Sequence, residues 1–172
     1  DYHLYFEEWW ARDIEYMVRR DRNHPCVITY SIGNEITERD GGNDGAEWSR
    51  KLAAKVREFD STRFVTSAIC GVFPEPEVED DEDDSAGTNF DLNLMQDNSV
   101  WNKATENYCK PLDIVGYNYL RDIYEESHEL FPDRVMIGTE THSFTTYDYW
   151  KKVEELPYVI GDCIWAAVDY MG

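Results

Sequence analysis

Residues 27–35 read Val-Ile-Thr-Tyr-Ser-Ile-Gly-Asn-Glu. The first six of these residues are mostly β-branched or aromatic, and such a short run predicts a strand that is buried on both faces. Gly33 ends the run, and two polar side chains, Asn34 and Glu35, stand at its carboxyl end. The stretch therefore predicts one strand of a helix-covered sheet, with polar groups at its end.

The segments on either side of this strand have the periodicity of helices. Upstream, apolar residues recur every three or four positions over residues 6–18, and the pattern stops before Pro25. Downstream, a glycine-rich linker at 40–45 leads into a second amphipathic stretch at 48–59 and then into a β-rich run at 64–69. Residues 27–69 are thus predicted to form one strand-helix-strand unit.

The same alternation continues to the end of the chain. Further strands are expected at 112–119, 134–140 and 158–169, and the helices before them at 100–109, 123–131 and 147–155. About five strands that alternate with helices imply parallel pairing through right-handed crossovers, which is the α/β class.

Two α/β architectures fit this order, a doubly wound open sheet and a (β/α) barrel. The glycine fingerprint of dinucleotide-binding sheets, G-x-G-x-x-G after a first strand, is missing from the sequence. Polar side chains stand at the ends of several predicted strands, and in a barrel these ends converge on one mouth. Five strands would then form the larger part of an eight-stranded TIM barrel, its fourth to eighth strands.

The chain length of 172 residues suits one domain, without a second one. Eight of the ten residues from Glu75 to Asp84 are acidic, and two prolines lie close by. We expect an exposed acidic insertion at about 73–99. Residues 1–172 as a whole are expected to form part of one barrel domain.

Charge and cysteine content narrow the partners and the compartment. Asp and Glu number 36 against 16 Lys and Arg, which gives a formal net charge of −20. Nucleic acids and anionic membranes bind clustered basic residues, so we expect neither as a partner. The four cysteines form no C-x-x-C motif, and we therefore expect reduced thiols and a cytoplasmic protein.

Two glutamates are the main candidates for chemistry. Glu35 and Glu140 each end a β-rich run, and in one barrel both carboxylates would point into the same cleft. Paired carboxylates suit cleavage of a glycosidic bond, because one protonates the leaving oxygen while the other attacks the sugar. The alternative is two ordinary surface glutamates in a chain that is rich in acids.

The sequence motifs around these glutamates resemble those of glycoside hydrolase family 2, the family of β-galactosidases, β-glucuronidases and β-mannosidases. The resemblance rests on Arg20-Asp21-Arg22-Asn23-His24-Pro25 before Gly33-Asn34-Glu35, on Asp60-Ser61-Thr62-Arg63, on Asp113-Ile114-Val115-Gly116-Tyr117-Asn118-Tyr119, on Ile137-Gly138-Thr139-Glu140-Thr141, and on Tyr158-Val159-Ile160-Gly161-Asp162 with Trp165. These motifs cover nearly the whole chain apart from the acidic insertion.

The resemblance implies a role for each matching residue. Glu35 would be the general acid/base and Glu140 the nucleophile, with Asn34 binding the 2-hydroxyl of the sugar. Tyr119 would hydrogen-bond the nucleophile, and Trp165 would form the floor of the sugar subsite.

Two further residues are expected at the substrate, Asn118 beside Tyr119 and His142 beyond the nucleophile. Arg22 and His24 lie on the amino side of their strand, away from the mouth of a barrel, so we expect them to support the fold.

The implied activity is a retaining exo-β-glycosidase with a carbohydrate substrate, most simply a terminal β-galactoside. A β-glucuronidase or β-mannosidase, an endo-acting barrel glycosidase and a non-catalytic carbohydrate-binding barrel are the alternatives. We expect no cofactor and no metal ligand within the chain, although a cation in a longer parent protein is compatible with the family. The first three barrel strands would be missing, so we also expect self-association of the isolated chain through exposed edges, and a homo-oligomeric parent.

Overall fold

The computed structural model describes residues 2–40, 42, 44–71 and 98–166. The helices are α1 (Phe6–Asp21), α2 (Gly45–Phe59), α3 (Asn98–Cys109), α4 (Tyr124–Leu130) and α5 (Thr146–Glu155). The strands are β1 (Thr29–Asn34), β2 (Phe64–Ile69), β3 (Ile114–Asn118), β4 (Met136–Thr141) and β5 (Val159–Ile164). Short 3₁₀ helices are η1 (Tyr2–Leu4), η2 (Thr37–Asp40), η4 (Arg121–Ile123) and η5 (Ser143–Thr145).

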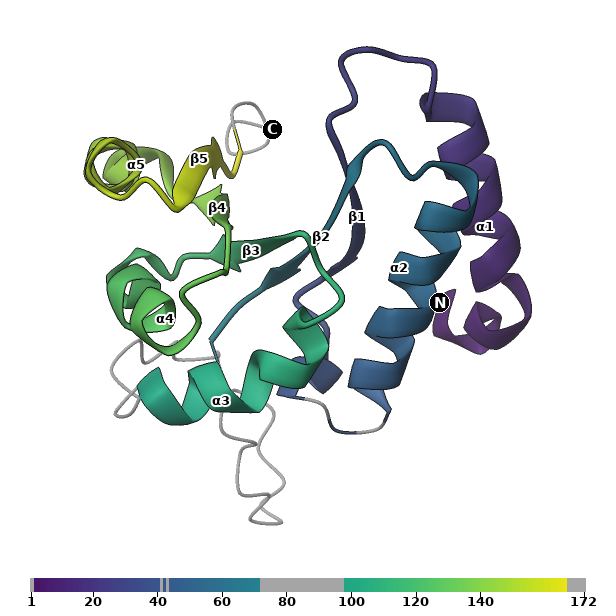
Figure 1. Ribbon diagram of the computed structural model, residues 1–172, viewed down its shortest axis with the longest axis horizontal. Coiled ribbons are helices and arrows are strands. Elements are labelled where there is room, and N and C mark those ends of the chain that lie inside the picture. The colour runs from purple at the N-terminus through teal and green to yellow at the C-terminus, as the bar shows by residue number, and fades with distance from the viewer. Residues whose placement is uncertain (1, 41, 43, 72–97, 167–172) are drawn as a thin grey trace, which may run out of the picture.

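The five strands form one parallel sheet in the order β1-β2-β3-β4-β5, so each strand pairs with its neighbours in sequence. A doubly wound sheet reverses its strand order partway, whereas a barrel keeps sequence order throughout. Figure 1 shows the strands as an arc with the helices around its outer side. The prediction of about five parallel strands that alternate with helices, as part of a TIM barrel, is confirmed.

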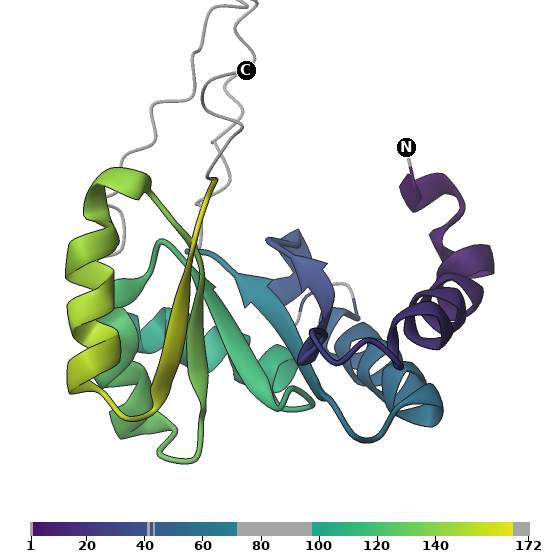
Figure 2. The same cartoon turned by 90° about the horizontal axis from the view of Figure 1, so that it is seen from above.

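The core fills the space between the sheet and the helices. One cluster joins α1 and α2 to the first two strands and consists of Val18, Tyr30, Ala53, Val56 and Val65. A larger cluster joins α3 and α4 to the later strands and includes Trp101, Tyr108, Val115, Tyr117, Tyr124 and Met136. The turned view in Figure 2 shows the helices on this outer side of the curved sheet. The apolar stripe of each amphipathic helix is therefore what holds the strands in place.

The pairing is irregular in three of the four strand pairs, β1–β2, β3–β4 and β4–β5. Between β3 and β4 the register runs from Tyr117–Gly138 directly to Asn118–Glu140, so Thr139 is an extra residue on β4. The pairing of β1 with β2 shifts in the same way between Ser31 and Asn34. Such bulges re-aim the side chains that follow them. Both strands that end near a predicted catalytic glutamate carry one.

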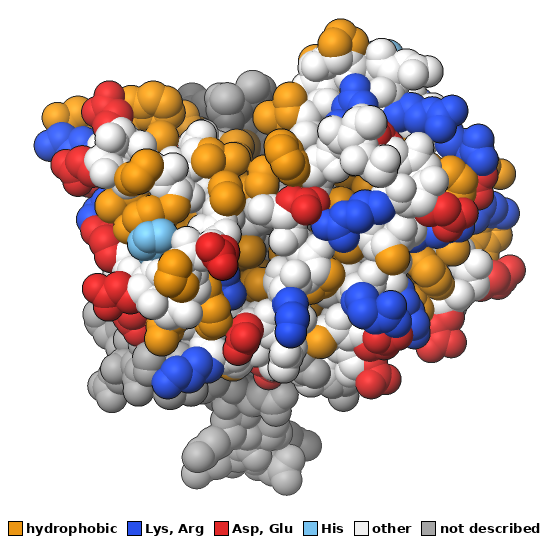
Figure 3. Space-filling model, viewed as in Figure 1, with side chains coloured by type: hydrophobic (Ala, Val, Ile, Leu, Met, Phe, Trp, Pro, Cys, Tyr) orange, Lys and Arg blue, Asp and Glu red, His pale blue; other side chains and the backbone are white. Residues whose placement is uncertain are grey.

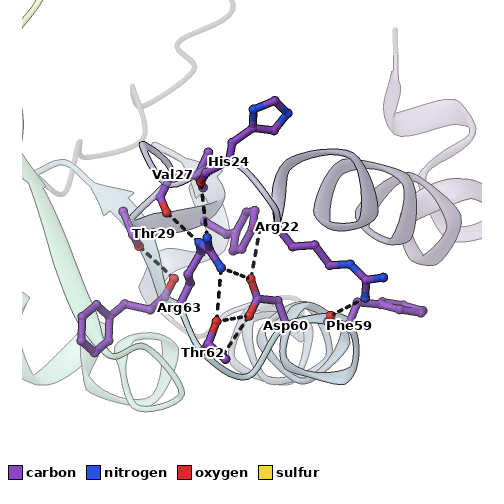
Figure 4. A network of polar contacts seen from close by, with 10 residues as sticks. Arg22, His24, Val27, Thr29, Phe59, Asp60, Thr62 and Arg63 are labelled. Atoms are coloured by element: carbon purple, nitrogen blue, oxygen red, sulfur yellow. Dashed lines mark hydrogen bonds and ion pairs between the residues drawn. The ribbon is translucent and has the colours of Figure 1, made fainter.

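Asp60 pairs with Arg63 in the loop before β2, and Figure 4 shows this ion pair and the hydrogen bonds around it at close range. Asp60, only 7% exposed, accepts hydrogen bonds from the backbone and the hydroxyl of Thr62 (2.9 and 2.6 Å) and from Arg63 (2.9 Å). These bonds, the Thr62 hydroxyl above all, hold the pKa of Asp60 below its usual value. Arg63 also donates to the carbonyl oxygens of Val27 and His24, which ties the loop before β1 to the loop before β2.

His24 and Arg22 therefore lie where the sequence placed them, at the amino side of β1. His24 offers its backbone carbonyl to Arg63, and Arg22 donates to the carbonyl oxygen of Phe59 at 3.3 Å. Val27 belongs to this network rather than to the ladder, and for that reason β1 begins at Thr29 instead of Val27.

Two strands are shorter than the sequence pattern predicts. β3 ends at Asn118 because Tyr119 takes a positive φ of 60°, which leaves the extended conformation. β5 ends at Ile164, and Trp165 already lies in a turn. The acidic insertion expected at 73–99 lies outside the described residues except for its last two positions, which open α3.

On the face shown in Figure 3, acidic and basic side chains lie interspersed, with hydrophobic groups between them. Ion pairs form along the surface of the helices, between Arg19 and Glu15 in α1 and between Arg50 and Glu47 in α2. Within the part of the chain that the structure describes, no helix combines the length and the apolar character needed to cross a membrane.

Candidate active site

Glu35 and Glu140 stand at the same edge of the sheet, at the carboxyl ends of β1 and β4. The backbone N–H of Glu35 donates to the carbonyl of Ala68 at the end of β2 (2.9 Å). The N–H of Tyr119 donates to the carbonyl of Glu140 (2.9 Å), and that of Trp165 to the carbonyl of Thr141 (2.8 Å). Backbone hydrogen bonds thus carry the ladder across this edge and bring four predicted site residues to it.

The side chain of Asn118 connects the end of β3 to the end of β1. Its amide Nδ2 donates to Oε1 of Glu35 at 2.9 Å and to Oδ1 of Asn34 at 3.2 Å. Its Oδ1 accepts from the hydroxyl of Thr139 at 2.5 Å. Asn118 is 1% exposed, so in this structure it contacts protein groups beneath the site, whereas Asn34 is exposed at the surface. The amide therefore holds the two side chains that reach the mouth.

Tyr119 connects the end of β3 to the end of β4. Its hydroxyl donates to Oε2 of Glu140 at 2.8 Å. Within the described part of the chain, the phenol holds the carboxylate of Glu140 through this one oxygen. The hydrogen bond that the resemblance implied between Tyr119 and Glu140 is present.

The backbone is strained at two of these positions. Glu35 has φ of 50° and Tyr119 has φ of 60°; a third positive value among the described non-glycine residues belongs to Asp44. The left-handed region costs an ordinary residue roughly 1 kcal/mol or more and persists where the surroundings demand it. Here the turn points each side chain across the sheet edge instead of along the strand.

Cys70, directly after β2, reports on the electrostatics between the glutamates. Burial raises the pKa of its thiol to about 11, and the charges of Glu35 and Glu140 both add to the rise while Arg39 opposes it. The thiol lies within electrostatic reach of both carboxylates.

A buried arginine supports the loop that follows Glu35. Arg39, in η2, donates to the carbonyl oxygens of Cys70 (3.0 Å) and Ile36 (2.8 Å) and also to that of Gly71. The indole N–H of Trp101 donates to the same Cys70 carbonyl at 3.1 Å. These bonds join the loop after β1 to the end of β2 and thereby fix the position from which Glu35 projects.

Aromatic rings line the other side of the edge. His142 stacks on Tyr119 with ring centroids 4.4 Å apart, and Phe144 stacks on His142 at 5.2 Å. Phe144 is 84% exposed and Trp165 50% exposed. The peptide bond from Trp165 to Ala166 is cis. Flat apolar faces next to paired carboxylates can receive the C–H face of a sugar ring.

The structure thus brings together all seven residues that the sequence nominated for the site. These are Asn34, Glu35, Asn118, Tyr119, Glu140, His142 and Trp165. Sequence reasoning missed Thr139, whose hydroxyl donates to Asn118, and it also missed Arg39 and Cys70, which link the loop after Glu35 to the end of β2. Thr139 lies beside a nominated residue in the sequence, but nothing in the pattern shows that a bulge turns its hydroxyl toward Asn118. Among the described residues no group of three His, Cys, Asp or Glu side chains is arranged to hold a metal ion.

Comparison with known proteins identifies the setting of this site. A family model described as "Glycosyl hydrolases family 2, TIM barrel domain" matches residues 6–171. The β-galactosidase BoGH2A of Bacteroides ovatus is 27% identical over 177 residues, which cover 92% of this chain and 19% of the relative. A β-glucuronidase of Bacteroides fragilis is 21% identical over 187 residues, which cover 96% of this chain and 24% of the relative.

A solved structure agrees with these matches. A glycosyl hydrolase family 2 member from Bacteroides cellulosilyticus is 35% identical and superposes with a TM-score of 0.76, over 96% of this chain and 19% of that one. The chain thus spans about a fifth to a quarter of the length of the curated relatives it matches.

Proposed function

Because the chain belongs to glycosyl hydrolase family 2, we propose that it supplies both catalytic carboxylates of a retaining β-glycosidase that hydrolyses terminal β-galactosides. The observation that carries this proposal is the pair Glu35 and Glu140 at one sheet edge, each held by a side chain from the end of β3. The remaining barrel strands and the rest of the substrate pocket would come from other parts of the protein that contains this chain.

In the first chemical step, Glu140 attacks the anomeric carbon of the sugar. Protonated Glu35 gives its proton to the glycosidic oxygen while the bond to that oxygen breaks. The products of this step are the free alcohol, a glycosyl ester on Glu140 and an ionised Glu35. The hydrogen bond from Tyr119 holds one oxygen of Glu140 and leaves the other free to attack.

In the second step, Glu35 takes a proton from a water molecule that attacks the same anomeric carbon. The ester bond to Glu140 breaks, and the sugar leaves with its original β configuration. Glu35 is protonated again and Glu140 is ionised, so the site returns to its starting state. Retention follows because each of the two displacements inverts the carbon once.

The other residues of the edge fit the binding of a sugar. Asn34 is exposed and fixed by Asn118, and its amide can bind the 2-hydroxyl, where hydrogen bonds strengthen as charge develops at the anomeric carbon. Trp165 and His142 present aromatic faces at the ends of β5 and β4. We assign these two to the sugar subsite and its rim.

Two observations favour a galactoside. A relative that matches over 92% of the chain is named a β-galactosidase, and the net charge of −20 favours a neutral substrate over an anionic one. A β-glucuronide is the second candidate, because another relative is named a β-glucuronidase. A local basic pocket from outside the described residues would decide between the two sugars.

The test is mechanism-based labelling of the protein that contains this chain with 2-deoxy-2-fluoro-β-galactosyl fluoride. This reagent traps the glycosyl ester because the fluorine at carbon 2 slows the second step. Intact-mass analysis and peptide mapping should show one adduct, on Glu140. Labelling by the glucuronyl or mannosyl analogue alone would change the sugar but keep the mechanism. Absence of labelling by every analogue would contradict the proposal and favour a non-catalytic carbohydrate-binding barrel.

A panel of polymers separates exo from endo action. We expect release of single galactose units from chain ends, and internal cleavage of β-glucans or β-mannans would instead indicate an endo-acting enzyme.

A further inference from the structure

The hydroxyl of Thr139 hydrogen-bonds to Asn118, the side chain that donates to Glu35 at the end of β1. It donates to Oδ1 of Asn118 at 2.5 Å, although Thr139 is the neighbour of Glu140 in sequence. Asn118 then donates to Glu35 at 2.9 Å and to Asn34 at 3.2 Å. One chain of hydrogen bonds therefore runs from β4 through β3 to the end of β1.

The chemistry of the amide shows what the hydroxyl does. Asn118 has one donor end and one acceptor end, and the two can exchange places by a turn of the side chain. Glu35 and Asn34 both offer oxygen atoms to it, so the NH₂ group must face them and the amide oxygen must face Thr139. A threonine hydroxyl can donate to that oxygen, which makes this orientation the satisfied one.

A free amide oxygen would compete for the proton of the acid. If Oδ1 of Asn118 turned toward a protonated Glu35, the carboxylic acid would donate to it rather than to the leaving oxygen. The oxygen is also buried, since Asn118 is 1% exposed, and a buried acceptor without a partner is costly. The bond from Thr139 removes both problems at once.

The fold makes a specific place for this hydroxyl. Thr139 is the bulged residue of β4, opposite no residue of β3. A Cβ atom on Gly116 would lie 2.7 Å from Cγ2 and 2.8 Å from Oγ1 of Thr139, so the threonine occupies space that only a glycine leaves open. The bulge and the glycine are two features whose common result is the contact between Thr139 and Asn118.

We infer that Thr139 is a positioning residue for the acid/base: it orients the amide of Asn118 so that Glu35 keeps its proton for the leaving group. This inference rests on the proposed function, since it presumes that Glu35 is the acid. It couples the two catalytic strands through a residue next to the nucleophile.

The test uses two substrates that differ in their need for an acid. Methyl β-galactoside has a poor leaving group and needs protonation, whereas 2,4-dinitrophenyl β-galactoside leaves without help. In Thr139→Val we expect kcat/KM to fall about 10-fold or more for the methyl glycoside and less than about 2-fold for the dinitrophenyl one, because general acid catalysis is worth about 10²- to 10⁴-fold. Thr139→Ser keeps the hydroxyl and should restore both rates to within about 2-fold of the wild type.

Glycine variants provide a second route and a matched control. Gly116→Ala should displace the hydroxyl and reproduce the selective loss of Thr139→Val. Gly161→Ala places the same methyl group in β5, where the nearest side-chain atom would be 3.8 Å away, and should change neither rate. Because the added Cβ of Gly116→Ala would also lie 2.9 Å from the backbone oxygen of Ser67, only a loss confined to the methyl glycoside counts as support for the role of Thr139.

The outcomes separate this inference from the proposed function. Equal losses of kcat/KM on both substrates, or no loss on either, in a folded Thr139→Val variant would overturn the role of Thr139. The proposed glycosidase function would still stand if the wild type hydrolyses both substrates. Failure of Thr139→Ser to restore the methyl glycoside rate would also overturn it. A wild type that hydrolyses neither substrate would refute the proposed function and this inference with it.

Discussion

Carboxylates at the two ends of the same sheet differ in burial and in the number of hydrogen bonds that they accept. At the amino ends of β1 and β2, Asp60 is buried and accepts bonds from Thr62, Arg63 and the hydroxyl of Tyr30. At the carboxyl ends, Glu35 and Glu140 are partly exposed, and each is held by one described side-chain donor, Asn118 or Tyr119.

The backbone differs between the two ends as well. The bulges of β1 and β4 and the positive φ angles of Glu35 and Tyr119 all lie toward the carboxyl side. A carboxylate whose oxygens are fully used can lock two loops together but cannot react. The carboxyl end instead combines positive φ angles with a single described side-chain donor to each glutamate, in line with the division of barrels into a stability face and a functional face.

The largest expected effect is the loss of activity on changing the carboxyl-end carboxylates to amides. Glu140→Gln should lower kcat at least about 1,000-fold, because the change removes the proposed nucleophile. Glu35→Gln should lower kcat/KM about 100-fold or more on a substrate with a poor leaving group. The matched control is Asp60→Asn, the same chemical change at the amino end, for which we expect an unchanged kcat. Loss of catalysis in Asp60→Asn at a temperature where it is folded would break the division between the ends.

A smaller effect is expected from the phenol that donates to Glu140, the proposed nucleophile. Tyr119→Phe removes the donor to Glu140 and should lower kcat about 10- to 100-fold with little change in KM. Its neighbour Tyr117 offers a matched control, since its hydroxyl accepts from Arg134 and lies in the core. Steady-state kinetics of Tyr117→Phe should match the wild type. A similar kcat for both variants would contradict the role of Tyr119.

At the amino end the expected effect is on stability. Asp60→Asn should lower the free energy of unfolding at pH 7 by about 2 kcal/mol, because charged hydrogen bonds to Arg63 and Thr62 are lost. The pKa of Asp60 is lowered in the folded state, so this stabilisation is present above the unfolded pKa and disappears as the pH falls through the folded pKa. Urea denaturation of both proteins should therefore show a difference at pH 7 that shrinks toward pH 3. A difference that is constant with pH would exclude the ion pair as its cause.

Asp162 in β5 differs from Asp60 in the direction of its pKa shift, which is upward. Burial raises its pKa to about 6, and its Oδ1 has no hydrogen-bond partner among the described residues. A raised folded pKa means that stability is full below the unfolded pKa and is lost as the pH rises through about 6. Asp162→Asn should thus be about 1 kcal/mol more stable than the wild type at pH 8, allowing for solvent screening, with no gain at pH 4. Thermal unfolding at the two pH values measures this, and a loss at pH 8 would show that the charge is used.

The sequence was sufficient for the features that repeat. The sequence pattern predicted each of the five described strands and five α-helices, because burial on the sheet and on one helix face imposes those periods, but it predicted none of the four 3₁₀ helices. Glu35 and Glu140 could be nominated for a related reason, since the carboxyl ends of parallel strands meet at one edge.

What the pattern could not predict depends on a single turn of the backbone or on one hydrogen bond. The positive φ of Tyr119 ends β3 early, and the extra residue in β4 brings the hydroxyl of Thr139 to Asn118. Asn118 lies buried beneath Asn34 and Glu35, and its expected contact with the substrate stays a prediction. Alternation of apolar and polar residues does not encode such displacements, because a bulge shifts the facing of every residue that follows it.

The most direct test of this division of roles is the configuration of the product that forms when azide rescues the two glutamate variants. With Glu35→Ala and a dinitrophenyl galactoside, azide should attack the glycosyl ester on Glu140 and give the β-galactosyl azide. With Glu140→Gly, azide should replace the missing nucleophile and give the α-galactosyl azide by a single inversion. Proton NMR distinguishes the two anomers. We predict β from the first variant and α from the second; the reverse assignment, or no azide product from either, would contradict the assignment of these two glutamates.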